Sequence, residues 1–285
     1  MIEQGLNTTT PEYWPINAKH ILKSKHISVG KLRKEFIQIS LPWDPTYNTD
    51  RVYFSLRIQQ RPLFIIKPAC KTELEKILNL VHVKKLTIRI MNGRHSSALV
   101  HSEVLIDMTN FTHKKLKRNV LIAGAGNTQG MLNDFLFNQN GLEHYSHFGS
   151  MIHPRVDTDA FPGGSAASVG SAGIATAGGI GTLCRTYSLT VDSIKSFEIV
   201  LCPTSDKKSR TICVSKKSHP NLFWALRGGV GCNFGIVTEI QYKIIEVPSI
   251  ILYKIKWPWT EAVRVLRQWK KTSINRPAEF NEDLV

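Results

Sequence analysis

Long apolar runs and a hydrophobic leader are both missing from this sequence of 285 residues. No stretch approaches the roughly 18–20 apolar residues that a membrane-spanning helix needs. The opening residues, MIEQGLNTTTPEYWP, lack the basic start and the apolar centre of a signal peptide. These absences predict a cytoplasmic protein without a membrane partner.

Cysteine is scarce, and its five copies form no CxxC pair. An odd number of unpaired cysteines disfavours both a zinc site and a disulfide framework. We therefore expect buried or idle thiols in a reducing compartment and no metal site.

Acidic residues are also few, because 22 Asp and Glu stand against 37 Lys and Arg, a net charge of +15. Such a charge suits nucleic acid, an acidic membrane surface or an anionic cofactor. The basic residues are spread out, and none of their small clusters is interleaved with aromatic residues as in a single-strand binder. The sequence therefore predicts solvated loop charges and no specific nucleic-acid partner.

What is present is a globular chain whose regular patterning begins at residue 63. The β-branched run 63–68 predicts a strand, and Thr72 predicts the N-cap of a helix that buries Leu74, Ile77, Leu78 and Val81. Strands follow at 86–91 and 104–108. This spacing predicts a small βαβ unit.

A second set of elements follows. The expected elements are strands at 120–123, 197–201, 211–214 and 236–245, a helix at 128–138 with Met131, Leu132 and Phe135 inward, and a helical turn at 221–226. After Pro248 the pattern predicts a new strand at 251–259 and a helix capped by Thr260. For residues 1–40, the sequence predicts only an extension or a leading helix.

The glycine pair Gly124 and Gly126 lies between an expected strand and an expected helix, which suggests a Rossmann fingerprint. The third glycine of that fingerprint is replaced by Gln129, and no acidic residue follows at the required place. The sequence therefore disfavours a Rossmann site here.

The segment FPGGSAASVGSAGIATAGGIG, residues 161–181, holds seven glycines and almost no bulky side chain. Glycine lets backbone N–H groups approach a ligand closely, and successive N–H groups bind phosphate oxygens. Val169, Ile174 and Ile180 are spaced as core anchors, which argues against a flexible linker. We interpret the segment as a pyrophosphate cradle, with tight packing between elements as the alternative.

Two further segments accompany it. MNGRHSS, residues 91–97, follows a strand, and its Asn-Gly turn can project His95 into a cleft, although a lone histidine is more often structural. Residues 227–235 form a second glycine-rich loop that enters a strand, where a backbone of small residues can lie against a planar ligand. A helix end with a connecting turn is the simpler alternative.

In this order and spacing, the three segments resemble the FAD domain of the vanillyl-alcohol oxidase and p-cresol methylhydroxylase superfamily, in its berberine-bridge-enzyme-like branch. The resemblance runs from about residue 41 to 247. It implies an α+β fold: an N-terminal extension at 1–40, a two-subdomain FAD-binding domain of the p-cresol methylhydroxylase type at 41–247, and the start of a truncated antiparallel-sheet substrate domain at 248–285.

The resemblance also implies which residues contact FAD. They are Asn92, Gly93, Arg94, His95, Ser96, Gly163, Gly164, Ser165, Val169, Gly170, Gly173, Gly178, Gly179, Ile180, Gly181, Gly235, Ile236 and Val237.

Within this set, His95 falls on the histidine that bonds covalently to the flavin in many relatives, whereas Ala166 replaces a second, cysteine tether. Arg94 and Ser188 replace family glycines. The Arg94 side chain is expected either to crowd the cofactor or to pair with its pyrophosphate.

The activity implied is FAD-dependent oxidation of a small alcohol, sugar or amine by hydride transfer to flavin N5, with O₂ as acceptor. No catalytic base is predicted, since Asp107 and Tyr187 stand where the family has structural residues. The alternative is a truncated, inactive relative that serves as a binding or interaction module. A strand begun at 251–259 without later strands predicts self-association or a complementing chain.

Overall fold

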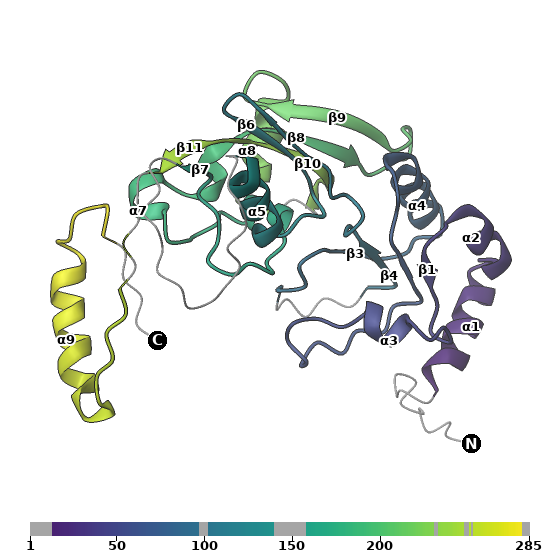
Figure 1. The fold of residues 1–285 in the computed structure, drawn as a ribbon. Coiled ribbons are helices and arrows are strands. Elements are labelled where there is room, and N and C mark those ends of the chain that lie inside the picture. The colour runs from purple at the N-terminus through teal and green to yellow at the C-terminus, as the bar shows by residue number, and fades with distance from the viewer. Residues whose placement is uncertain are drawn as a thin grey trace.

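The computed structural model describes residues 13–96, 102–139, 158–230, 233–247, 251 and 253–280. Two sheets carry the fold, with the N-terminal helices at one end and helix α9 at the other (Figure 1). No helix among the described residues has both the length and the apolar character needed to cross a membrane.

The first sheet has the strand order β1-β2-β4-β3, in which β2, β4 and β3 run parallel and β1 is antiparallel to β2. Its strands are β1 (Ile39–Ser40), β2 (Phe64–Ile66), β3 (Ile88–Met91) and β4 (Val104–Asp107). The helices that accompany it are α1 (Trp14–Ser24), α2 (Val29–Glu35), α3 (Tyr47–Asp50) and α4 (Lys71–Val83). The β2, α4, β3 order confirms the βαβ unit expected from the sequence.

The core of this unit contains the expected apolar face of α4. It also contains side chains from α1 and α2, whose burial was not predicted from the sequence. Leu74, Ile77, Leu78 and Val81 of α4 are all buried, as predicted. The N-cap is Cys70, so Thr72 lies in the first turn instead of capping the helix. α1 and α2 bring Ala18, Leu22, Leu32 and Phe36 into the same core, and residues 14–35 are therefore two packed helices.

The second sheet is antiparallel, with the order β5-β6-β10-β8-β9. Its strands are β5 (Lys114–Lys117), β6 (Val120–Gly124), β8 (Ile194–Leu201), β9 (Arg210–Ser215) and β10 (Gly235–Lys243). The remaining elements are α5 (Gln129–Gln139), β7 (Thr158–Ala160), α6 (Ser171–Thr176), α7 (Cys184–Tyr187), η1 (Thr190–Ser193), α8 (Pro220–Leu226) and β11 (Ile245–Val247), which pairs with β7.

Helix α5 confirms the expected helix but corrects its buried face. Leu132 and Leu136 are buried and Phe135 is partly buried, whereas Met131 is exposed. The inward residues therefore follow the spacing 132, 135 and 136, and Met131 lies on the edge of the solvent face.

Two of the three apolar cores among the described residues, which we call the first and the second, share strands β8 and β10. Val200 of β8 and Ile236 of β10 pack in the first core, while their neighbours Ile199 and Val237 pack in the second. Successive residues of a strand point to opposite faces of the sheet, so the second sheet separates the two cores. An ion pair between Lys71 of α4 and Glu198 of β8, 3.0 Å long, adds a polar contact across the boundary.

The segment after residue 250 differs from the prediction. The described residues between 251 and 258 form no strand, so the expected strand at 251–259 is wrong. The helix begins after η3 (Trp259–Glu261) as α9 (Ala262–Ser273), with no side-chain cap from Thr260. No residue of α9 is buried, and Figure 1 shows this helix standing apart from the sheets.

Candidate functional site

The loop that follows β3 meets two other segments through Asn92 and Gly93. The Asn92 side-chain amide donates to the carbonyls of Ala125 at 2.7 Å and Asn127 at 2.9 Å. A Cβ on Gly93 would lie 2.1 Å from the backbone nitrogen of Gly170. No side chain fits in that space, so glycine at 93 is what allows the loop to touch the glycine-rich segment.

The link between β6 and α5 is bonded to the same glycine-rich segment. Ser171 N–H donates to the Asn127 carbonyl at 2.9 Å, and Gln129 N–H donates to the Val169 carbonyl at 2.9 Å. The Gln129 side chain accepts from the N–H of Gly164 at 3.1 Å. Residues 92–95, 125–130 and 163–171 therefore meet at one place, which we call the three-loop junction.

His95 lies at the edge of this junction. Its Nε2 is 2.8 Å from the Ser168 hydroxyl, and its ring stacks on Phe54 with centroids 4.6 Å apart and planes 14° apart. No hydrogen bond to Nδ1 occurs within the described residues. The imidazole is thus held by one nitrogen and one face, and the other nitrogen is left for a ligand.

Arg94 turns away from the junction. Its Nη1 donates to the carbonyls of Thr49 at 3.1 Å and Val52 at 3.3 Å, and its Nη2 pairs with Asp107 at 3.2 Å. The guanidinium is thus bonded within the protein in this structure, and its contact with a cofactor, by crowding or by pairing with the pyrophosphate, stays a prediction. Asp107 is fully buried, and its carboxylate explains the direction that the guanidinium takes.

The glycine-rich segment folds as two turns around the short helix α6. A Cβ on Gly181 would lie 1.8 Å from the Gly163 carbonyl, so the two ends of the segment touch. Within the described part of the chain, the N–H groups of residues 165–168 and 178–180 donate to no acceptor. Unused, closely spaced N–H groups of this kind can bind the oxygens of a phosphate.

Several buried polar atoms near the junction also lack a partner within the described residues: Oδ1 of Asn92, Nε2 of Gln129, Oγ of Ser171 and Oγ1 of Thr190. A buried polar atom without a hydrogen bond is unusual and calls for a bound group or a water. By contrast, the space beside Gly173 and Gly178 is open to at least 4 Å. The residues present fit a phosphate-bearing cofactor.

β10 contacts the junction through Tyr242. The Tyr242 hydroxyl donates to the Ser171 carbonyl at 3.3 Å, and its ring contacts Phe161 at 4.9 Å between centroids. Complete burial raises the pKa of Tyr242 well above its ordinary value, although the hydrogen bond to Ser171 lowers it in part. The phenol therefore stays neutral, and its role is to pack against Phe161 and to hold the Ser171 carbonyl.

The second glycine-rich loop attaches to the other end of α6. The N–H groups of Gly228 and Val230 both donate to the Thr176 carbonyl, at 3.0 and 3.1 Å. Gly235, Ile236 and Val237 lie in β10 and pair with β8, and both branched side chains are buried in the cores. Their packing in the sheet is established, whereas their contact with a cofactor stays a prediction, and Gly231 lies outside the described residues.

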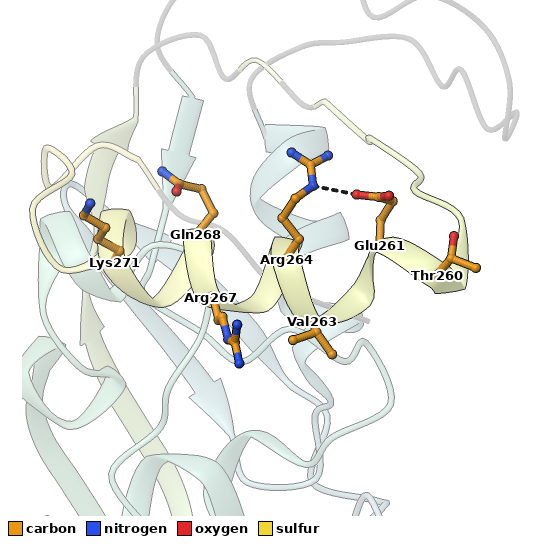
Figure 2. Close-up of a pocket in the computed structure, with 7 residues that line it drawn as sticks. All are labelled: Thr260, Glu261, Val263, Arg264, Arg267, Gln268 and Lys271. Carbon is orange, nitrogen blue, oxygen red and sulfur yellow. Dashed lines mark hydrogen bonds and ion pairs between the residues drawn. The ribbon is translucent and has the colours of Figure 1, made fainter.

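A further hollow lies along one side of α9 and is shown in Figure 2. It is lined by Arg264, Arg267 and Lys271 among others, and Arg264 pairs with Glu261. None of the predicted cofactor residues lines it, so it is separate from the three-loop junction.

Sequence reasoning did not identify Phe54, Asn127, Gln129 or Ser168 as parts of the site. Phe54 and Ser168 reach His95 only through the tertiary fold, and no local pattern marks them. Gln129 did carry a signal, because it breaks the Rossmann fingerprint with a polar residue that the structure buries completely.

No family model matches the chain. The uncharacterized FAD-linked oxidoreductase YgaK of Bacillus subtilis is 30% identical over 234 residues, covering 80% of this chain and 47% of its own length. Berberine bridge enzyme-like 23 of Arabidopsis thaliana is 26% identical over 235 residues, covering 79% and 40%. The chain thus spans about half the length of these curated relatives.

Among solved structures, a variant of Phl p 4 described as a glucose oxidase superposes with a TM-score of 0.71 at 23% identity, over 88% of this chain and 50% of that chain. Its structural neighbours are FAD-binding oxidases of the p-cresol methylhydroxylase type with mixed α/β content, and this chain shares their fold. The chain is a homologue of the FAD-linked oxidoreductases, berberine-bridge-enzyme-like proteins among them.

Proposed function

We propose that residues 41–247 bind FAD as the cofactor domain of an FAD-linked oxidoreductase. The proposal rests on the three-loop junction. Among the described residues, N–H groups without acceptors, buried polar atoms without hydrogen bonds and closely packed glycines all lie in or beside this junction. The name FAD-linked oxidoreductase, which several relatives carry, supports FAD as the cofactor.

The N–H groups of residues 165–168 and 178–180 would hold the pyrophosphate. Asn92, Gln129 and Ser171 supply the buried polar atoms that have no partner among the residues the structure describes. When bound, FAD supplies the redox chemistry by accepting a hydride at N5, and the protein orients it.

We propose a small alcohol, sugar or amine as the substrate and O₂ as the electron acceptor. A sugar is favoured by the glucose oxidase activity named for the Phl p 4 variant. No described side chain stands out as the catalytic base, since Asp107 is buried and paired with Arg94. We keep the cytoplasmic location as a prediction.

We further propose that His95 alone tethers the flavin. The bond would replace one C–H of the 8α methyl group and the imidazole N–H, and the two protons and two electrons released would pass to O₂, giving hydrogen peroxide. Nε2 faces Ser168, so Nδ1 is the nitrogen available for this bond. Ala166 leaves no second, cysteine tether.

The test is a visible spectrum of the purified chain before and after acid precipitation. We expect a flavin spectrum in the native protein and fluorescence that stays with the protein in a denaturing gel. In His95→Ala, the flavin should move to the acid supernatant. A colourless protein that takes up no added FAD would overturn the proposal.

A second outcome would favour a different function. Bound flavin without turnover of any alcohol, sugar or amine would fit a binding or interaction module. A chain that complements this one and restores turnover would instead show an enzyme assembled from two parts.

A further inference from the structure

Arg94 has a backbone conformation that its residue type rarely adopts. Its φ is 63°, in the left-handed region that favours glycine. The side chain nevertheless forms three polar contacts, to the carbonyls of Thr49 and Val52 and to the buried carboxylate of Asp107. Contacts of this kind explain why a left-handed arginine is held in place.

Those contacts tie the segment 49–54 to the loop that carries His95. The Phe54 N–H donates to the Arg94 carbonyl at 3.0 Å, so main chain and side chain both connect the two segments. Phe54 is an exposed aromatic residue, and its ring lies flat on His95. We call the Arg94 side-chain contacts with Thr49, Val52 and Asp107 the clamp, which acts together with the main-chain bond to hold the exposed Phe54 ring against the imidazole.

We propose that Arg94 is a positioning residue for His95: by fastening the segment 49–54 to Asp107, it keeps Phe54 stacked on the imidazole and fixes the ring plane. Ser168 fixes the ring from Nε2. The imidazole is then restricted in both tilt and rotation and meets a flavin in one orientation. The significance for the flavin rests on the proposed function, whereas the clamp itself can be tested without a cofactor.

The first experiment measures how fast diethyl pyrocarbonate modifies His95 in the purified full chain, by peptide mass spectrometry. The variants are Phe54→Ala, which removes the stacked ring, and Arg94→Ala combined with Asp107→Asn, which removes the clamp without leaving a buried carboxylate unpaired. We expect the rate at His95 to rise several-fold in both.

Two controls separate positioning from general loosening. His113, which pairs with Glu239 at 2.9 Å, reports in the same samples and should keep its rate. Arg33→Ala removes a comparable arginine–aspartate pair, to Asp44, and should leave His95 unchanged. Arg94→Lys keeps the charge and should recover part of the wild-type protection.

An unchanged rate at His95 in Phe54→Ala would overturn the inference, as would equal increases at His95 and His113. This variant changes an exposed side chain, so it tests the stack even if the clamp variant fails to fold.

The second experiment adds FAD and O₂ and measures total and acid-stable flavin separately. The clamp and Phe54 variants should bind total flavin as wild type does and lose most of the acid-stable share. Equal acid-stable shares in wild type and both variants would overturn the inference. A wild type that binds no flavin would overturn the proposed function, while the reactivity of His95 would still decide the clamp.

Discussion

Ser188 follows α7 with φ 70° and ψ −173°, a conformation that is almost confined to glycine. The serine therefore stores backbone strain that a glycine at this position would avoid. We expect Ser188→Gly to raise the free energy of unfolding by about 1 kcal/mol, after the greater flexibility of glycine in the unfolded chain is subtracted.

Urea unfolding measures this effect. Ser188→Ala is the matched control, because it removes the same hydroxyl but keeps the strained backbone, and it should give no gain. Equal stabilisation by alanine and glycine would show that the backbone is not the cause.

Asp50 predicts a pH dependence. Burial alone would raise the pKa of Asp50, but hydrogen bonds from Lys67, at 2.6 Å, and from Ser40 and Thr46 hold it below the ordinary value of 3.8. A carboxyl with a lowered pKa in the folded state stabilises the protein above its unfolded pKa and loses that contribution as pH falls through the folded pKa.

The free energy of unfolding should therefore drop between about pH 4 and the lower pKa of folded Asp50. In Asp50→Asn this part of the acid dependence should disappear, as seen in urea titrations at several pH values. Asp206→Asn, at an exposed loop residue, should retain it, and an unchanged acid profile in Asp50→Asn would refute the assignment.

At the scale of elements, Gly173 of α6 allows a sharper test of cofactor binding by segment 161–181 than the glycines of that segment that pack against backbone atoms. The space beside Gly173 is open and the residue is exposed, so a side chain there reaches only what binds outside the helix. We expect Gly173→Leu to lose most of its bound flavin and to stay folded, because leucine is a good helix former.

Gly173→Ala is the control and should keep its flavin, measured as absorbance per protein. Gly179→Val is unsuitable, since its Cβ would lie 2.2 Å from the Thr190 hydroxyl and would disturb the fold itself. Full flavin content in Gly173→Leu would place the cofactor elsewhere.

The elements were predictable where a local pattern met a buried partner. Residues 64–66 and the apolar face of α4 follow directly from β-branched runs and helical spacing. The expected strand at 251–259 failed because no described strand pairs with it, and alternation alone cannot supply a partner.

The N-terminal helices show the opposite error. Trp14, Ala18 and Leu22 stand at a helical spacing that could have indicated a buried face in α1. In the candidate site, the glycine segment was visible in the sequence, but the contacts of His95 with Ser168 and Phe54 were not. Those residues are distant along the chain, and only the fold brings them together.

For the whole molecule, the exposed apolar side chains of η3 and α9 predict self-association in solution. Trp259 of η3 is 90% exposed, and Val263 and Leu266 of α9 are also exposed and follow it at the spacing of one helical face. Grouped apolar side chains of this kind favour association. We expect sedimentation velocity to show reversible self-association of the 285-residue chain that grows with concentration.

Replacing Trp259, Val263 and Leu266 together with serine should return the chain to a monomer. Trp224→Ser removes a similarly exposed tryptophan from α8 and should leave association unchanged. A wild type that sediments as a monomer at all concentrations would show that this surface is tolerated in water.

The alternation along β8 and β10 also sets how the protein comes apart. One face of the second sheet packs in the first core and the other face packs in the second core. Unfolding of either core therefore exposes the apolar side chains of the other. Ile236→Ala and Val237→Ala remove methyl groups from opposite faces, and the isoleucine change should cost about 2–5 kcal/mol. Each should nevertheless lower the same single melting transition in calorimetry, because packing on one face of the sheet cannot be lost without packing on the other.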